Sequence, residues 1–191
     1  LVNLNNMRTF TGNKINVCLP RTIKYGNFVS REILTGQTTD DGIFISLGFQ
    51  DIDTEIRNKF QSFHKNAHIL IDVANGHMEK ILEYCRKIKK YRPDITIMVG
   101  NIANPDTYYW YAESQCVDYI RVGIGNGGGC LTTKQSGVGY PMASLIYNTY
   151  RVKLRFKTFH SELKAPAIIA DGGMKDYSDI IKALALGADY V

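Results

Sequence analysis

Several signals that define whole classes of protein are missing from this sequence of 191 residues. No apolar run approaches the roughly 18 residues that a membrane-spanning helix needs, and no secretory signal is visible. None of the four cysteines lies in a C-x-x-C pair, and no histidine has zinc-binding spacing to them. These absences argue against a membrane-spanning, secreted or zinc-stabilised protein and favour a reduced, cytoplasmic one.

A strong charge of one sign is also missing, because 23 basic residues against 18 acidic ones give a net charge of only +5. The lysines and arginines are spread over helical patterns, which is typical of a solvated helix face rather than a nucleic-acid surface. A mild positive field also suits a small phosphorylated substrate. The sequence therefore predicts neither a nucleic-acid nor a membrane partner.

Continuous apolar runs alternate with helical patterns along the chain. Strands are predicted at residues 15–19, 43–48, 68–74, 95–99, 119–122 and 167–170, with a strand tail at 1–7 and the start of a further strand at 188–191. Helices are predicted at residues 29–35, 51–65, 78–91, 105–114, 142–159 and 177–186. Strands that are apolar on both faces indicate a parallel sheet covered by helices.

Polar and glycine residues gather where four of these strands end, at Asp72–Gly76, Gly100–Asn101, Gly123–Cys130 and Asp171–Gly173. In an open sheet, ligands collect at one switch point, whereas in a (β/α)8 barrel many successive strand ends build one site. The pattern predicts an α/β fold, a TIM barrel forming a single domain over residues 1–191. An intact barrel needs about 250 residues and the chain begins with Leu, so we expect a fragment, a compact variant or the ordered part of a longer protein.

The most informative stretch runs from Asp118 to Pro141. Five glycines occupy the seven positions 123–129, directly before Cys130. Such a density is found where the backbone takes unusual angles or approaches a ligand, and free N–H groups there stabilise a thiolate. Cys130 is therefore a candidate nucleophile, with a flexible loop and a chance cysteine as the alternative. The other cysteines, in apolar or helical patterns, are expected to be buried: Cys18, Cys85 and Cys116.

The segment GIGNGGGCLTTKQSGVGYP resembles the catalytic loop of the IMP dehydrogenase/GMP reductase family, which usually reads GIGPGSxCTT followed by GVGYP. Residues 71–77 (IDVANGH) are similar to the DVANG segment of GMP reductases, and residues 99–102 (VGNI) resemble the GGNV segment of the family. Residues 169–173 (IADGG) and 182–188 (KALALGA) also match. The motifs keep the family's order over most of residues 43–191.

The resemblance implies a purine nucleotide oxidoreductase. The Cys130 thiolate would attack C2 of the purine, and Thr132 would assist proton transfer. In a GMP reductase, ammonia leaves, NADPH delivers a hydride to the covalent thioimidate, and IMP is released. In an IMP dehydrogenase, a hydride passes to NAD and water releases XMP. DVANG, GVGYP and the absence of a regulatory CBS insertion favour the reductase, whereas IADGG and KALALGA look equally like the dehydrogenase.

The resemblance also implies the binding residues. Asp171 would bind the ribose hydroxyls through charge-assisted hydrogen bonds. The phosphate would be approached by the backbone of Gly128, Gly172 and Gly173, and the nicotinamide would be lined by Asp72, Val73, Ala74, Asn101 and Gly123. A potassium ion would be held by the carbonyls of Gly125, Gly127 and Cys130, and a homotetramer is expected. Without the resemblance, the two aspartates could equally be helix caps or turns, and Asn101 a turn former.

The chain departs from the family pattern in places. Gly128 stands where the family has a serine whose hydroxyl binds phosphate, so phosphate is bound more weakly or by other groups. Leu131 replaces the first threonine of the CTT motif, and strand 8 and the mobile flap with its catalytic acid would follow Val191. A non-catalytic barrel that serves as a nucleotide-binding or partner subunit is therefore a second hypothesis, although the combination of Cys130, Thr132 and Asp171 favours an enzyme.

Overall fold

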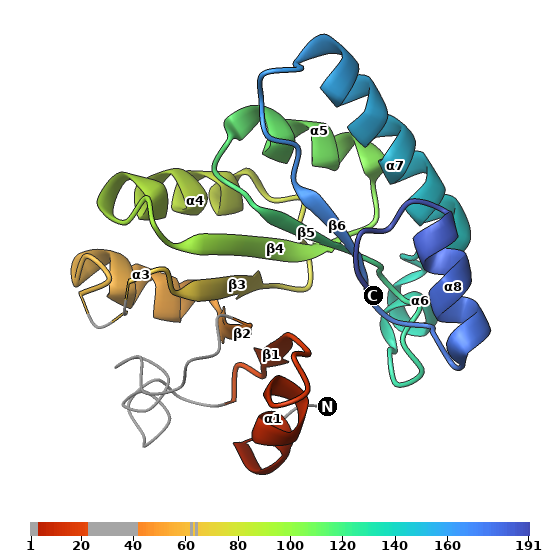
Figure 1. Cartoon of the computed structure of the whole chain (residues 1–191), viewed down its shortest axis with the longest axis horizontal. Helices are drawn as coiled ribbons and strands as arrows, with labels where there is room; N and C mark the ends of the chain where they lie inside the picture. The colour runs from red at the N-terminus through yellow and green to blue at the C-terminus, as the bar shows by residue number, and fades with distance from the viewer. Residues whose placement is uncertain (1–3, 23–41, 62, 64) are drawn as a thin grey trace. The chain divides into compact units, whose positions relative to one another are not determined.

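The computed structural model describes residues 4–22, 42–61, 63 and 65–191. Its strands follow the chain order β1-β2-β3-β4-β5-β6 in one sheet, and from β2 onward a helix lies between successive strands (Figure 1). This is the parallel α/β architecture of a partial TIM barrel, as the alternating pattern predicts. The chain divides into two compact units, one containing the described residues up to Asp72 together with Glu83–Met98, and the other containing Val73–Leu82 and Val99–Val191.

The first unit contains a parallel sheet that is buried on both faces. Its elements are α1 (Leu4–Thr11), β1 (Val17–Leu19), β2 (Ile43–Leu47), α3 (Phe49–Arg57), β3 (His68–Asp72), most of α4 (Glu79–Tyr91) and the start of β4 (Thr96–Ile102). β1 pairs with β2 and β2 with β3, all in parallel register. All five residues of β2 and the three central residues of β3 are buried, as their continuous apolar runs predict.

The prediction of a strand tail at residues 1–7 is wrong, because α1 covers Leu4–Thr11. Met7 and Thr11 are both buried and lie four residues apart, which places them on one helix face. The Thr11 hydroxyl also donates to the Met7 carbonyl at 3.3 Å, and Asn13 donates to Thr9 O at 2.6 Å. Helical spacing, rather than alternation, is therefore the pattern that governs this short segment.

The helix predicted at residues 51–65 is shorter than expected, since α3 ends at Arg57. Lys59 and Phe60 take positive φ angles of 53° and 51°, which turn the chain back. The turn buries Phe60 completely, and the Arg92 guanidinium donates to the carbonyls of Phe60 and Phe63 at 2.9 and 3.0 Å. Burial of these two rings stabilises the turn against continuation of the helix.

The second unit contains the end of β4, α5 (Pro105–Ser114), β5 (Tyr119–Val122), α6 (Thr132–Ser136), α7 (Met142–Phe159), β6 (Ala167–Ala170) and α8 (Tyr177–Ala185). The predicted bounds of α5 and α7 are confirmed, whereas α6 was not predicted. β5 pairs with β6 in parallel, and Ile169 forms a parallel bridge to Tyr190, where a further strand was predicted to start. Figure 1 shows α5 and α7 side by side, and the Tyr109 and Phe156 rings meet edge to face 5.5 Å apart between them.

Two of the three cysteines predicted to be buried are only half-buried. Cys85 is buried, but Cys18 lies on the more open face of the short strand β1, and Cys116 lies beyond the end of α5 with its thiol 3.2 Å from Ser114 O. The helix predicted at residues 29–35 lies outside the described residues. None of the described helices combines the length and apolar content needed to cross a bilayer.

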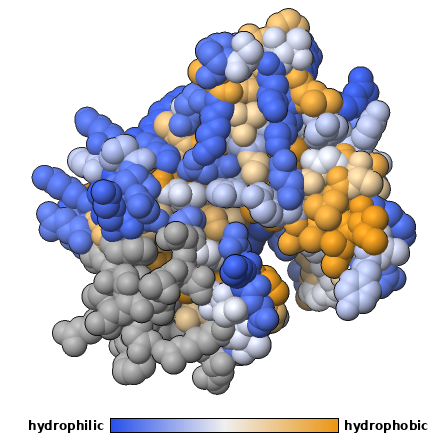
Figure 2. All heavy atoms as spheres, viewed as in Figure 1, coloured by the Kyte–Doolittle hydropathy of each residue, from blue (hydrophilic) through white to orange (hydrophobic). Residues whose placement is uncertain are grey.

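Helix α8 exposes an apolar side to solvent. Figure 2 shows a hydrophobic patch over this helix, and Ile181 and Leu184 are 65% and 44% exposed. The helix itself is well started, because the Asp176 carboxylate caps it by accepting from the N–H groups of Ser178 and Asp179. Ile181 and Leu184 are therefore exposed on a helix whose N-terminus is capped.

Candidate active site

A polar network joins three predicted site residues at the ends of β4, β5 and β6. The Asn101 amide donates to the Gly123 carbonyl at 2.7 Å and to the Asp171 carboxylate at 2.8 Å. Gly123 follows β5 and Asp171 follows β6, and the Asp171 N–H donates to the carbonyl of the last β5 residue. The predicted nicotinamide residues Asn101 and Gly123 therefore lie beside the predicted ribose ligand Asp171.

Arg121 belongs to the same network and was missed by the sequence analysis. Its Nε donates to the Asn101 side-chain oxygen and lies 3.5 Å from an Asp171 carboxylate oxygen. The guanidinium thereby fixes which way the Asn101 amide points, with its NH2 toward Asp171. The only signal in the sequence was a single charged residue inside the apolar run of residues 119–122.

The predicted nicotinamide residues 72–74 are placed by their backbone. Val73 exchanges hydrogen bonds with β4, donating to Gly100 O at 3.1 Å and accepting from Asn101 N–H at 3.3 Å. Ala74 is exposed next to it. Asp72 belongs to the first unit, where its carboxylate lies 3.4 Å from Arg21 Nε. The structure thus brings Val73 to the strand end that carries Asn101.

The glycine loop is closed by two neutral side chains. The Asn126 amide donates to the carbonyls of Tyr140 and Ile124 at 3.0 and 3.3 Å, and the Thr133 hydroxyl donates to Val138 O at 2.8 Å. Gly125 has a φ of +86°, and a Cβ there would collide with the Thr133 hydroxyl. Glycine is therefore required at 125 both by the backbone angle and by this bridge.

The Gly172–Gly173 turn after β6 packs against this loop. A Cβ on Gly172 would lie 3.1 Å from the backbone nitrogen of Gly127, and one on Gly173 would lie 3.1 Å from the backbone carbonyl oxygen of Asn126. Both glycines take positive φ angles, +93° and +83°. The close approach brings predicted phosphate residues next to Gly127, one of the predicted potassium ligands.

Cys130 is exposed, and its sulfur lies 3.3 Å from the Thr132 hydroxyl oxygen. Thr132 is the first residue of α6, and Cys130 N–H donates to Gly127 O at 2.9 Å. The Thr132 hydroxyl holds the pKa of the Cys130 thiol below its ordinary value, and backbone N–H groups of Thr132 and Gly125 lower it further against a small desolvation effect. The arrangement favours the thiolate, the nucleophilic form of cysteine.

Gly128 and Gly129 differ from the other glycines of the loop. A Cβ at either position would meet nothing within 4 Å, and neither has a positive φ. Nothing packs against Gly128, so its predicted role at the phosphate would rest on its backbone N–H alone. Neither the backbone angle nor the available space requires glycine there. A serine would fit at residue 128, so its absence removes a hydroxyl group without being forced by the backbone.

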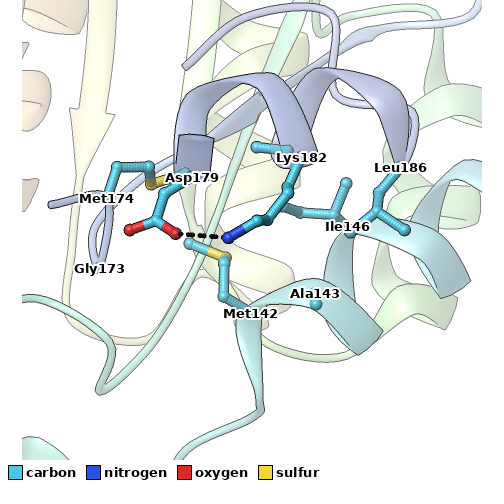
Figure 3. A pocket seen from close by; sticks show the side chains of 9 residues that line it. Met142, Ala143, Ile146, Gly173, Met174, Asp179, Lys182 and Leu186 are labelled. Carbon is cyan, nitrogen blue, oxygen red and sulfur yellow. Dashed lines mark hydrogen bonds and ion pairs between the residues drawn. The ribbon is translucent and has the colours of Figure 1, made fainter. Parts of the chain in front are cut away.

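A cavity of about 170 Å³ lies beside Gly173, between α7 and α8 (Figure 3). Met142, Met174 and Leu186 form much of its wall, and an Asp179–Lys182 ion pair of 3.4 Å lies at its edge. A pocket for a whole nucleotide or drug-sized ligand is typically about 300–1,000 Å³. This cavity is smaller than that range.

His77 lies in the turn before α4, where its ring is held in place by neighbouring polar groups. Its Nε2 accepts from the Ala103 N–H at 3.0 Å, so Nδ1 carries the proton and donates to the Thr107 hydroxyl at 2.7 Å. Burial lowers the pKa of His77 and favours this neutral form. Both ring nitrogens are therefore engaged.

Taken together, the fold and the site define a barrel-type α/β protein with an exposed cysteine on a glycine-rich strand end. A family model of the IMP dehydrogenase / GMP reductase domain matches residues 50–191. The chain belongs to this family.

Similar proteins include both branches of the family. The chain is 39% identical over 140 residues to an inosine-5'-monophosphate dehydrogenase of Staphylococcus haemolyticus, covering 73% of this chain and 27% of that protein. It is 31% identical over 154 residues to a GMP reductase of Caenorhabditis elegans, covering 80% and 40%. A crystal structure of a Trypanosoma brucei GMP reductase in complex with guanosine 5'-monophosphate superposes with a TM-score of 0.64 at 25% identity, covering 78% of this chain and 29% of that one. The chain thus spans between about a quarter and two fifths of the length of these proteins.

Proposed function

We propose that this chain is the nucleophile-bearing part of a GMP reductase, which converts GMP to IMP with NADPH. The observation that carries the proposal is the exposed Cys130, whose pKa is lowered by Thr132 on a glycine-rich strand end. In the proposed reaction, the thiolate adds to C2 of the guanine, the 2-amino group leaves as ammonia, and a thioimidate links C2 to the sulfur. Thr132 holds or moves the proton next to the leaving group.

The strand-end network is proposed to position both reactants. Asp171 accepts hydrogen bonds from the ribose hydroxyls, while Asn101 and Arg121 keep its carboxylate in place. The backbone N–H groups of Gly172 and Gly173, together with Gly128, face the phosphate. We propose that the nicotinamide lies against Asn101, Gly123 and residues 72–74.

The cofactors fit the groups that are present. When bound, the nicotinamide supplies the hydride that C2 receives, and the chain contributes only its position. The carbonyls of Gly125, Gly127 and Cys130 are hard, neutral oxygen donors of one loop, which suits a potassium ion. The Gly127 carbonyl already accepts from Cys130 N–H, so an ion bound there would act on the segment that carries the nucleophile. A homotetramer is also proposed, and light scattering of the intact protein would test it.

IMP dehydrogenase is the second candidate. The higher identity to the Staphylococcus haemolyticus protein, 39% against 31% for the Caenorhabditis elegans reductase, favours it. In this reading the same thiolate adds to C2 of IMP, a hydride leaves C2 toward NAD, and water then releases XMP. The residues that hold the nucleotide would be the same.

Absorbance of the reduced nicotinamide separates the two reactions. The intact protein in potassium buffer is mixed with GMP and NADPH, or with IMP and NAD, and Cys130→Ala is the control. Loss of NADPH with GMP supports the reductase, whereas formation of NADH with IMP supports the dehydrogenase. Activity with neither pair, in a folded protein that still binds GMP, would favour the non-catalytic nucleotide-binding subunit.

A further inference from the structure

Helix α7 has a solvent-facing side that the proposed reaction does not use. Its inner side is buried, and Phe156 on that side contacts Tyr109 of α5. The outer side carries three large apolar side chains, and Tyr147, Leu154 and Phe159 are 48%, 46% and 68% exposed. Figure 2 shows hydrophobic and hydrophilic atoms interleaved over this part of the second unit. Tyr147 and Leu154 are seven residues apart and lie on the same side of the helix, and Phe159 lies farther round it at the C-terminal end. The three side chains together leave a large apolar area exposed.

Two arginines lie on the same outer side of α7. The Arg151 guanidinium lies 6.0 Å from the centre of the Tyr147 ring, and the Arg155 guanidinium lies 5.9 Å from that of Phe159. Each pair is four residues apart, so ring and cation are neighbours on the helix surface about 6 Å apart along the axis. Cation–π attraction therefore holds rings and charges together on one surface.

The positive charge of α7 is not balanced on the helix itself. Residues 142–159 contain four basic residues and no acidic one, whereas the exposed face of α4 mixes Glu79 and Glu83 with its basic residues. Lys153 is paired with Asp189 at 2.6 Å. Within the part of the chain that the structure describes, no ion pair joins Arg151 or Arg155 to a carboxylate. The outer face thus presents charge that would be complementary to acidic groups.

The composition of this face favours a protein partner over other anionic partners. A membrane-bound amphipathic helix inserts a continuous apolar side, but the continuous apolar side of α7 is buried against the rest of the unit, and the outer side alternates its apolar side chains with arginines. Nucleic-acid binding is carried by many phosphate contacts, and two arginines with one neighbouring lysine are few for that purpose. Tyrosine, phenylalanine and arginine are, however, the residues enriched at the centres of protein interfaces.

We propose that the outer face of α7, formed by Tyr147, Arg151, Leu154, Arg155 and Phe159, binds an acidic protein segment that presents apolar side chains. Carboxylates of the segment pair with the two guanidinium groups, which are already oriented by the rings beneath them. Its apolar side chains cover Leu154 and the exposed parts of the two rings. This binding does not depend on the proposed oxidoreductase activity.

The experiment measures binding of a fluorescein-labelled peptide that alternates glutamate pairs with leucine and phenylalanine, by fluorescence anisotropy with the intact protein. Arg151→Glu/Arg155→Glu is expected to weaken binding at least about tenfold, because attraction becomes repulsion. Tyr147→Ser/Phe159→Ser keeps the charge and is expected to weaken it by a similar factor. The matched control is Arg86→Glu/Lys90→Glu on α4, with the same charge change at the same four-residue spacing, and it should change affinity by less than about twofold.

Several outcomes would overturn the proposal. No saturable binding of the peptide, or an equal loss in the α4 control, would leave only non-specific attraction. Tighter binding of an oligothymidine or of phosphatidylserine vesicles, with the same dependence on the α7 variants, would assign the face to nucleic acid or membrane. Self-association that the α7 variants abolish would assign it to a second copy of the chain. Circular dichroism of each variant establishes that α7 is still folded, and the two double variants alter different side chains, so one tests the proposal if the other misfolds.

Discussion

The strand-end network and the glycine loop follow each other in the second unit, yet they are held in different ways. Asn101, Arg121 and Asp171 come from three strand ends and are joined by bonds that involve a guanidinium and a carboxylate. The loop that carries Cys130 is exposed from Gly128 to Gly139 and is closed by a neutral amide and a hydroxyl that donate to carbonyls. Charge-assisted bonds are roughly twice as strong as neutral ones. The comparison indicates that the strand-end network is firmly positioned and that Cys130 lies on a more adaptable segment.

The largest expected effect is loss of the nucleophile. Cys130→Ser removes the thiolate, and we expect the rate of nicotinamide oxidation by GMP to fall by more than about a thousandfold. The side chain is exposed and lies against the Thr132 hydroxyl rather than in the core, so the melting temperature should stay unchanged. Stopped-flow absorbance and calorimetry measure the two quantities. A variant that keeps substantial activity would contradict covalent catalysis by Cys130.

A change at Gly125 should damage the loop while sparing the strand-end network. Gly125→Ala places a Cβ where the Thr133 hydroxyl lies and strains a φ of +86°, so activity should fall about a hundredfold. Gly129→Ala is the matched control in open space and should retain most activity. Steady-state kinetics of both variants make the comparison, and equal losses would show that the closure by Thr133 is irrelevant.

A change at Arg121 should damage the strand-end network while sparing the loop. Arg121→Met leaves the Asn101 oxygen without this donor and Asp171 without its nearby cation. We expect KM for the nicotinamide and for the nucleotide to rise about tenfold, with a smaller change in kcat. Alkylation of Cys130 should proceed at the wild-type rate. A slower alkylation would mean that the two regions are coupled.

The pKa of Cys130 gives a finer test of the loop. Because the Thr132 hydroxyl lowers this pKa, the midpoint of iodoacetamide alkylation should lie below that of an unperturbed thiol. Thr132→Val should shift the midpoint upward and slow alkylation at pH 7 about threefold, since less thiolate is present. Gln135→Ala, at an exposed position of the same short helix, is the control. Mass spectrometry after timed quenching measures the alkylation of Cys130. An unchanged midpoint would show that Thr132 does not lower the pKa of Cys130.

A similarly small effect is expected from restoring the family serine. Gly128→Ser adds a hydroxyl where nothing lies within 4 Å of a Cβ and where φ is not positive. The melting temperature should be unchanged, and affinity for GMP should rise severalfold, about 1 kcal/mol for one added hydrogen bond. Calorimetric titration of GMP into both proteins checks this. Weaker binding would show that the phosphate does not lie beside residue 128.

Much of this architecture could be predicted because buried parallel strands and a glycine cluster are strong local signals. The bounds of α5 and α7, and the pairing of β5 with β6, follow from apolar spacing that tertiary contacts reinforce. Arg121 could not be identified, because its role depends on two strand neighbours that are distant in sequence. The early end of α3 was hidden because Lys59 and Phe60 take positive φ angles without any glycine. α6 is a single short helix that starts beside Cys130, and propensity is weak over so few residues.

The closure of the glycine loop by Asn126 and Thr133 has a consequence for how the protein opens. These two side chains join the ends of the segment through carbonyls of Tyr140 and Val138, and residues 128–139 bury no side chain in the core. We therefore expect the segment to open separately, so that its amides exchange with deuterium through local opening and faster than those of β5 and β6. The loop that carries Cys130 would thus open and close many times while β5 and β6 remain folded.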